Sequence, residues 1–276
     1  MRGLDVEAEY NNRARVANSA DIIERWFKAA ALARRELPGD RDSAYGTKPR
    51  QVYDFYPASS ADRAPLVVYI HGGYWQRGHG SDYAFVAREF LARGVSVAIP
   101  SYTLCPEVGI AQITGEVSVF LSALWNRTKV RPVLAGHSAG GHLAASLMSR
   151  RRIDGAPEDL ITSAYGISGV YDLRPLVSTT LNEPLRLDEI AAKAISPMFY
   201  PVPDKNCRFV AAAGGEESSE FIRQARDFAK SWSDGGAAAT SAIIPGANHF
   251  TIVDELTRPG TSMLNDIVAM AEQVAS

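Results

Sequence analysis

The stretch VLAGHSAGGHLAASL, residues 133–147, constrains the fold more than any other part of the sequence. Its apolar beginning is typical of a buried strand, and its alanine- and leucine-rich end is typical of a helix. Ser138 therefore lies in a glycine-rich turn between a strand and a helix. The pentapeptide GHSAG, Gly136 to Gly140, fits the pattern G-x-S-x-G, in which glycines let the backbone turn sharply enough to expose a nucleophilic serine.

Other apolar runs of strand length alternate with stretches of helical periodicity. The predicted strands are QVYDFYP, LVVYI, VSVAI, PVLAG, AYGIS, RFVAAAG and TSAII. The predicted helices cover about residues 19–37, 83–93, 117–127, 140–149, 220–233 and a segment after residue 261. Continuous apolar strands suit a mostly parallel sheet with helices on both faces, so the order predicts one doubly wound α/β domain over residues 1–276.

Two segments lie outside this alternation. Residues 1–45 read as an N-terminal helical extension, whose aromatic pair Trp26 and Phe27 is expected in the core. Residues 171–205 contain five prolines around a short amphipathic piece at about 185–194. We expect this second segment to form a small cap over the carboxyl ends of the strands, where ligands enter such sheets.

The motif HGGYW, residues 71–75, directly follows the strand LVVYI. Its glycines, Gly72 and Gly73, can turn backbone N–H groups toward the serine. With the N–H of Ala139, they predict an oxyanion hole. A glycine turn without a catalytic role is the alternative.

A candidate base follows the last predicted strand, in the motif GANHF. A serine hydroxyl is a poor nucleophile without a base, and His249 suits the chain order serine, acid, histidine. The acid is expected after RFVAAAG, where Glu216, Glu217 and Glu220 all qualify by spacing. Asp172 is a second-line alternative, so the residues alone leave this choice open.

The four other histidines are His71, His79, His137 and His142. We expect His71 to anchor the glycine loop through hydrogen bonds and His79 to lie in an exposed loop. His137 and His142 are five residues apart across the turn and lack a carboxylate cluster, so no metal site is predicted.

Composition points to a small-molecule partner. With 29 basic and 31 acidic residues and a net charge of −2, the chain has no basic block that would favour a nucleic acid. The first residues lack an apolar leader, and no run reaches the about 18 apolar residues of a membrane span, so we expect a cytoplasmic protein. Cys105 and Cys207 are expected to be reduced thiols. A homodimer is compatible with these features.

The segments HGGYW, GHSAGGHL, SGVYDLRPL, LNEPLRLDEIAAKAISPMFY and ESSEFIRQ together resemble the kynurenine formamidase (arylformamidase) branch of the α/β-hydrolase superfamily. They span most of the chain from about residue 65 onward. The resemblance places the triad acid on Glu217, the first position of a D-S-P-E-F-like segment. This chain departs from the pattern with Glu217 for the commoner aspartate, Ser219 for the proline and Gly141 where many formamidases carry alanine.

The resemblance implies a serine hydrolase that cleaves an aryl formamide, such as N-formylkynurenine, into an aryl amine and formate through a formyl-enzyme. Tyr74 and Trp75 are candidates for the substrate pocket, although Trp75 could instead pack the loop onto the body. The mechanism requires no metal or organic cofactor. The alternatives are a carboxylesterase of broad specificity and a catalytically silent binding protein of the same fold.

Overall fold

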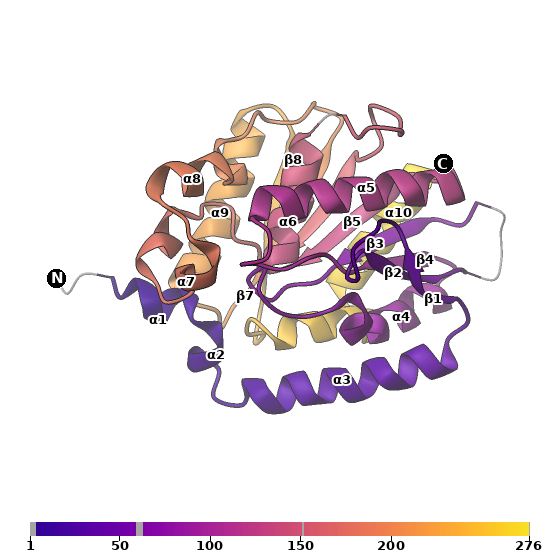
Figure 1. Cartoon of the computed structure of the whole chain (residues 1–276), viewed down its shortest axis with the longest axis horizontal. Coiled ribbons are helices and arrows are strands. Elements are labelled where there is room, and N and C mark those ends of the chain that lie inside the picture. The colour runs from indigo at the N-terminus through magenta and orange to yellow at the C-terminus, as the bar shows by residue number, and fades with distance from the viewer. Residues whose placement is uncertain (1–3, 59–62, 151, 276) are drawn as a thin grey trace.

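The computed structural model describes residues 4–58, 63–150 and 152–275. Among these residues it contains one eight-stranded sheet, in the order β1-β2-β4-β3-β5-β6-β7-β8. The strands are β1 (Asp40–Ala44), β2 (Val52–Tyr56), β3 (Leu66–Ile70), β4 (Ser96–Pro100), β5 (Pro132–His137), β6 (Ser163–Ile167), β7 (Arg208–Gly214) and β8 (Ala238–Ile244). Of the strand pairs in the described ranges, β1–β2 and β2–β4 are antiparallel and the others are parallel. The predicted α/β fold class is confirmed (Figure 1).

The helices connect these strands. The α-helices are α1 (Val6–Tyr10), α2 (Asn12–Arg15), α3 (Ser19–Glu36), α4 (Ala87–Ala92), α5 (Ile110–Thr128), α6 (Ala139–Ser149), α7 (Asn182–Leu185), α8 (Glu189–Ala194), α9 (Ser219–Asp234) and α10 (Ser262–Ala275). The 3₁₀ helices are η1 (Gly80–Val86), η2 (Arg174–Ser178), η3 (Pro197–Phe199) and η4 (Thr251–Leu256). The predicted helix at 83–93 is thus η1 followed by α4. Half-buried His79 caps η1, because its Nδ1 lies 3.3 Å from the Ser81 amide nitrogen, so the expected exposed position is wrong.

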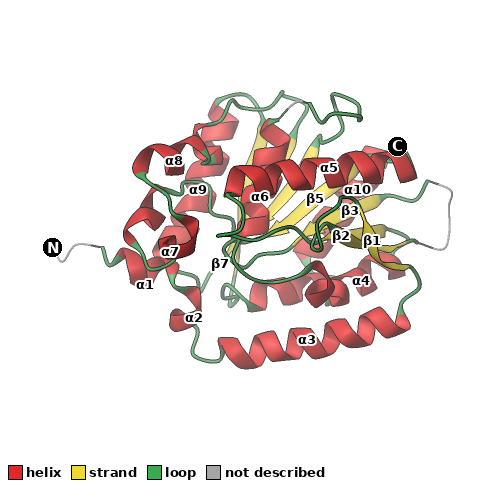
Figure 2. Cartoon of the chain, viewed as in Figure 1, coloured by secondary structure: helices red, strands yellow, loops and turns green. Residues whose placement is uncertain are grey.

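Two apolar clusters cover the two faces of the sheet. Side chains of α5, α6 and α9 belong to one cluster, and side chains of α3, α4 and α10 belong to the other. Figure 2 shows the helices on both sides of the strands. Along β3, Leu66, Val68 and Ile70 face the first cluster, whereas Val67 and Tyr69 face the second. Burial on both faces explains why this strand is apolar throughout.

The strand register brings several loops to one edge of the sheet. Ile70 pairs with Gly136, His137 pairs with Ile167, and Ile167 pairs with Ala212. These parallel strands therefore end at nearly the same level. The loops after β3, β5, β6 and β7 leave the sheet beside one another, which is where α/β sheets bind ligands.

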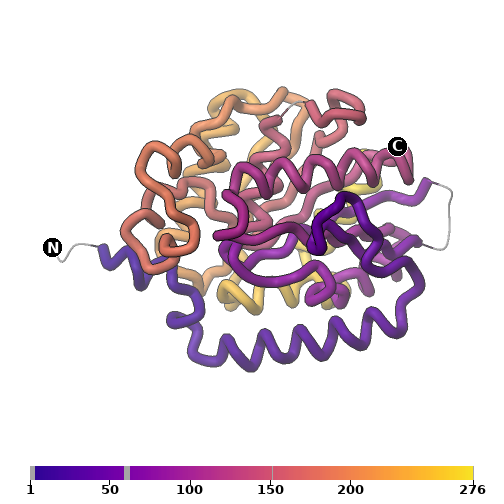
Figure 3. The backbone as a smooth tube through the Cα atoms, viewed as in Figure 1, coloured from indigo at the N-terminus to yellow at the C-terminus, as the bar shows by residue number. Residues whose placement is uncertain are grey.

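The N-terminal segment is only partly the helical extension that the sequence predicts. The long helix α3 is present, but residues 40–44 of the predicted extension form β1 at the edge of the sheet. Before α3, the short helices α1 and α2 form a segment, residues 5–16, that we call the N-terminal arm. Figure 3 follows this indigo segment from the region of α7 to α3.

The predicted cap, residues 171–205, holds η2, α7, α8 and η3 between β6 and β7. The expected helical piece at 185–194 is interrupted, because Arg186 adopts a φ of 55° between α7 and α8. The Gln76 amide donates to the Leu181 carbonyl at 2.8 Å, which joins this segment to the loop after β3. Figure 1 shows α7 and α8 near α1 and α9.

Candidate active site

Ser138 occupies the sharp turn between β5 and α6. Its φ of 56° and ψ of −117° are unusual for a residue with a side chain, so the surrounding structure must hold the turn in place. The Ser138 amide donates to the Ile167 carbonyl at 2.8 Å. A Cβ atom at Gly136 would lie 2.1 Å from the Gly140 oxygen, and one at Gly140 would lie 2.0 Å from the Ile70 oxygen. Both motif glycines are therefore required by close backbone packing.

His249 lies in the loop between β8 and η4 and pairs with a buried carboxylate. Its Nδ1 lies 2.8 Å from Oε2 of Glu217. The other carboxylate oxygen accepts hydrogen bonds from the Gly214 amide at 2.6 Å and from the Ser168 hydroxyl at 2.5 Å. The side chains of His249 and Glu217 are 5% and 0% exposed. A carboxylate at Nδ1 favours the tautomer that leaves Nε2 available to accept a proton.

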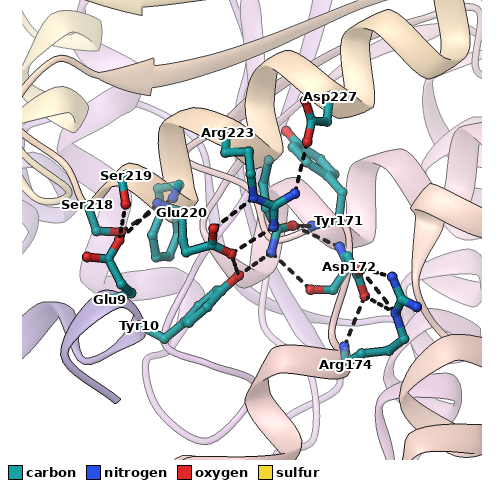
Figure 4. A network of polar contacts seen from close by, with 12 residues as sticks. Glu9, Tyr10, Tyr171, Asp172, Arg174, Ser218, Ser219, Glu220, Arg223 and Asp227 are labelled. Atoms are coloured by element: carbon teal, nitrogen blue, oxygen red, sulfur yellow. Dashed lines mark hydrogen bonds and ion pairs between the residues drawn. The ribbon is translucent and has the colours of Figure 1, made fainter. Parts of the chain in front are cut away.

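The other carboxylates that spacing allowed have different surroundings. Asp172 pairs with the Arg174 guanidinium at 2.7 Å, and Glu220 pairs with Arg223 at 2.7 Å, as Figure 4 shows. Glu216 is exposed. Of the candidates, the structure thus brings Glu217 to the histidine, as the family resemblance implies.

Ser138 and His249 both line a pocket of about 180 Å³. Its apolar lining consists largely of aromatic side chains, among them Trp26, Phe27, Tyr74, Tyr83 and Phe250. Trp26 is buried in the core and also lines this pocket, whereas Phe27 is 50% exposed. The expected core position is therefore confirmed for Trp26 and wrong for Phe27, and both side chains line the pocket. The dimensions and the aromatic lining suit a small aryl group.

The loop after β3 lies against the serine. A Cβ atom at Gly72 would lie 3.0 Å from the Ser138 Cβ and 2.8 Å from the His137 oxygen. Gly73 has a φ of 112° and lines the pocket. Ala139 is the first residue of α6, and the first N–H groups of a helix have no partner within it. Gly72 and Ala139 thus adjoin the serine, and Gly73 lines the pocket that contains it.

The two aromatic pocket candidates of this loop differ in position. Tyr74 lines the pocket, and its hydroxyl donates to the Tyr10 carbonyl at 2.6 Å. Trp75 is fully buried in the core, where its ring packs edge-on against the His142 ring with 4.9 Å between the ring centroids. Trp75 is not among the lining residues, so the structure places it as the packing alternative describes.

Three buried histidines support the site. Burial lowers the pKa of His71 and His137 to about 3 and that of His142 to about 4, so all three stay neutral near pH 7. His71 Nδ1 lies 2.8 Å from the Gly72 oxygen, which provides the expected anchor of the loop. His137 Nε2 lies 2.8 Å from the His249 carbonyl oxygen. Within the described ranges, no group of three or more histidine, cysteine or acidic side chains could hold a metal ion.

Sequence reasoning missed Ser168 and the polar residues that the N-terminal arm adds to the pocket. The signal for Ser168 is its place at the end of the predicted strand AYGIS, where the preceding Ile167 pairs with His137 beside the turn at Ser138. The arm contributes Asn11, Asn12 and Arg13. No local pattern marks them, because α1 and α2 contain five and four residues.

Comparison with known proteins places the chain in a family. A family model described as an alpha/beta hydrolase fold matches residues 67–201. The kynurenine formamidase of Salmo salar is 33% identical over 77% of this chain and 75% of that protein. The kynurenine formamidase of Drosophila melanogaster is 31% identical over 85% of this chain and 84% of that protein.

A solved structure from Silicibacter sp. TM1040, which carries a provisional thioesterase name, is also similar. It has a TM-score of 0.86 and 32% sequence identity, and the match covers 96% of this chain and 99% of that one. Among the described residues, no helix combines the length and the apolar character needed to cross a membrane. The protein is an enzyme of the α/β hydrolase superfamily, and its chain belongs to the kynurenine formamidase family.

Proposed function

We propose that the protein cleaves an aryl formamide into an aryl amine and formate through a formyl-enzyme. The observation that carries the proposal is the buried Glu217–His249 pair. Its histidine lines, together with Ser138, a pocket with aromatic walls. The kynurenine formamidase relatives support the formamide as substrate class.

In the first step, His249 Nε2 takes the proton of the Ser138 hydroxyl as Oγ attacks the formyl carbon. Glu217 accepts a hydrogen bond from Nδ1–H and thereby orients the ring and stabilises the imidazolium that forms. The carbonyl oxygen becomes an oxyanion, to which Gly73 and Ala139 offer backbone N–H groups, while Gly72 allows the close approach.

In the second step, the imidazolium gives its proton to the aryl nitrogen, the C–N bond breaks, and the formyl group stays on Ser138. Protonation is necessary because an aryl amide anion is a very poor leaving group. A water molecule then attacks the formyl carbon with His249 as base. Collapse of this adduct returns the proton to Ser138 and releases formate.

The second candidate is a carboxylesterase, because the same groups cleave an ester more readily than an amide. The thioesterase name of the Silicibacter relative favours this candidate. The discriminating experiment measures kcat/KM of the purified protein for N-formylkynurenine, N-formylanthranilate and p-nitrophenyl acetate. Efficient turnover of a formamide supports the proposal, whereas cleavage of the acetate alone leaves an esterase.

A catalytically silent protein is tested separately with a fluorophosphonate probe. We expect the probe to label Ser138, since a phosphonylating reagent needs an activated serine and an oxyanion hole. An unlabelled protein that also leaves all three substrates intact would contradict an activated nucleophile at Ser138.

A further inference from the structure

The outer part of the pocket is rich in arginine side chains. Arg13 of the N-terminal arm and Arg77 of the loop after β3 line the pocket that contains the serine. The same two residues line an adjoining cavity of about 620 Å³, together with Arg186 and Glu183 of the cap. Three separate regions of the chain thus bring guanidinium groups to the entrance, by which we mean the part of the pocket lined by these arginines.

These arginines are not matched by acidic partners. Among the described residues, Arg13, Arg77 and Arg186 form no ion pair, whereas nine other arginines do. Partial burial and the positive charge of Arg77 lower the pKa of Arg13. Against these three guanidinium groups, two carboxylates, Asp82 and Glu183, line the same two cavities. The entrance therefore has an excess of positive charge.

A neutral polar group of the pocket also lacks a partner. Asn12 is only 3% exposed and lines the pocket, yet neither Nδ2 nor Oδ1 of its side chain has a hydrogen-bond partner among the described residues. Buried amide groups nearly always have partners. A polar ligand atom at this place would supply one.

Side-chain hydrogen bonds hold the arm that carries Asn12 and Arg13. The Tyr10 hydroxyl donates to Glu220 at 2.9 Å and accepts from the Gln224 amide at 2.7 Å. Figure 4 shows Tyr10 and Glu9 of the arm against the start of α9. Because the arm is fixed, its groups are positioned before a ligand arrives, which lowers the entropy lost on binding.

We infer that Arg13 and Arg77, with the amide of Asn12, bind a carboxylate carried by the aryl part of the substrate. This inference rests on the proposed function and narrows it to aryl formamides with an acid group. The guanidinium fork matches the two oxygens of a carboxylate, and the pocket that both arginines line also has aromatic walls and contains Ser138.

The kinetic test compares an anionic with a neutral formamide. We would measure kcat/KM for N-formylanthranilate and for formanilide with wild type, Arg13→Gln and Arg77→Gln. In each variant, kcat/KM should fall about tenfold more for the anionic substrate than for the neutral one. The fall should come mainly from a higher KM, since one charge-assisted contact with the carboxylate is lost. The control is Arg15→Gln, which replaces an exposed arginine of α2 outside the pocket and should leave kcat/KM for both substrates unchanged. Equal losses on both substrates would overturn the inference.

A binding experiment separates this inference from the proposed function, since it needs no turnover. Calorimetric titration of wild type with anthranilate and with aniline should give at least about tenfold tighter binding of the acid, and Arg77→Gln should remove this preference. If formamides are not cleaved but the preference is present, the proposed reaction fails and the anion site stands. Equal or absent binding of the two compounds would overturn the anion site, whatever the reaction.

Discussion

The loops that follow the strands and the N-terminal arm meet at one pocket but are held there by different forces. The strand-end loops are fixed by the register of the sheet, and their pair His249 and Glu217 is almost fully buried. The arm is fixed by side-chain contacts, such as Tyr10 with Glu220. We infer that changes at the strand ends act on the chemical step, whereas changes in the arm act on substrate binding.

The largest effect is expected for Glu217→Gln. The amide keeps the size of the side chain but favours the wrong tautomer of His249, which should lower kcat by about 10³ to 10⁴. The matched control is Glu216→Gln, an exposed neighbour, which should retain wild-type kcat. A loss below tenfold in Glu217→Gln would mean that another group orients the histidine.

The strand-end region should also make the protein sensitive to acid. Burial lowers the pKa of His71 and His137 to about 3 and that of His142 to about 4, against an ordinary value of 6.5. Below pH 6.5 the unfolded chain binds protons that the folded chain does not, so stability is lost as the pH falls toward 4. The free energy of unfolding should fall by at most about 1.4 kcal/mol per pH unit for each histidine, which is about 4 kcal/mol per pH unit for all three.

Urea unfolding at pH 7.0 and 5.5 measures this loss. The variant His142→Gln keeps a donor for the Ile195 carbonyl, which accepts from the ring in the wild type, and should reduce the slope by about a third. A free energy of unfolding that is the same at both pH values would contradict the neutral, buried state of these rings.

A smaller catalytic effect is expected for Gly72→Ala. The added methyl group would lie 3.0 Å from the Ser138 Cβ and 2.8 Å from the His137 oxygen, so the loop must move away from the serine. The displaced N–H groups should lower kcat/KM by about a hundredfold. As the control, Gly115→Ala in α5 meets no atom within 4 Å and should stabilise the protein by about 0.5–1 kcal/mol with unchanged activity. Full activity of Gly72→Ala would remove this loop from the oxyanion hole.

The smallest effect should come from the arm. Tyr10→Phe removes the donor to Glu220 and the acceptor for Gln224, so Asn12 and Arg13 lose part of their support. We expect KM to rise about threefold to fivefold, with less change in kcat, because the two lost hydrogen bonds hold the arm and do not contact the reacting groups. Tyr45→Phe, which removes a buried bond to the Ser101 carbonyl, should cost similar stability and leave KM unchanged. A lower kcat at constant KM in Tyr10→Phe would contradict the inference that the arm acts on substrate binding and the strand ends on the chemical step.

The two regions also differ in how far the sequence predicts them. The turn at Ser138 and the loops with Gly73 and His249 each follow an apolar strand, so local patterns place them at the edge of the sheet. The choice of Glu217 over its neighbours depends on where a side chain points, which spacing does not determine. The resemblance to the formamidase family supplied that choice.

The arm and the edge strand lack such patterns. The helices α1 and α2 are too short for a helical period to show, and β1 reads DRDSA, a polar stretch that pairs only at the sheet edge. The positions of the Tyr74 and Trp75 side chains are likewise not predictable from local sequence patterns. Both have positive φ, yet one lines the pocket and the other enters the core, because the loop backbone sets their directions.

The most direct test of the account measures formate release from N-formylkynurenine by wild type and by Ser138→Ala. We predict turnover by the wild type and a rate of formate release at least about 10⁴-fold lower in the variant, which lacks the nucleophile. Equal rates for the two proteins would contradict a formyl-enzyme on Ser138.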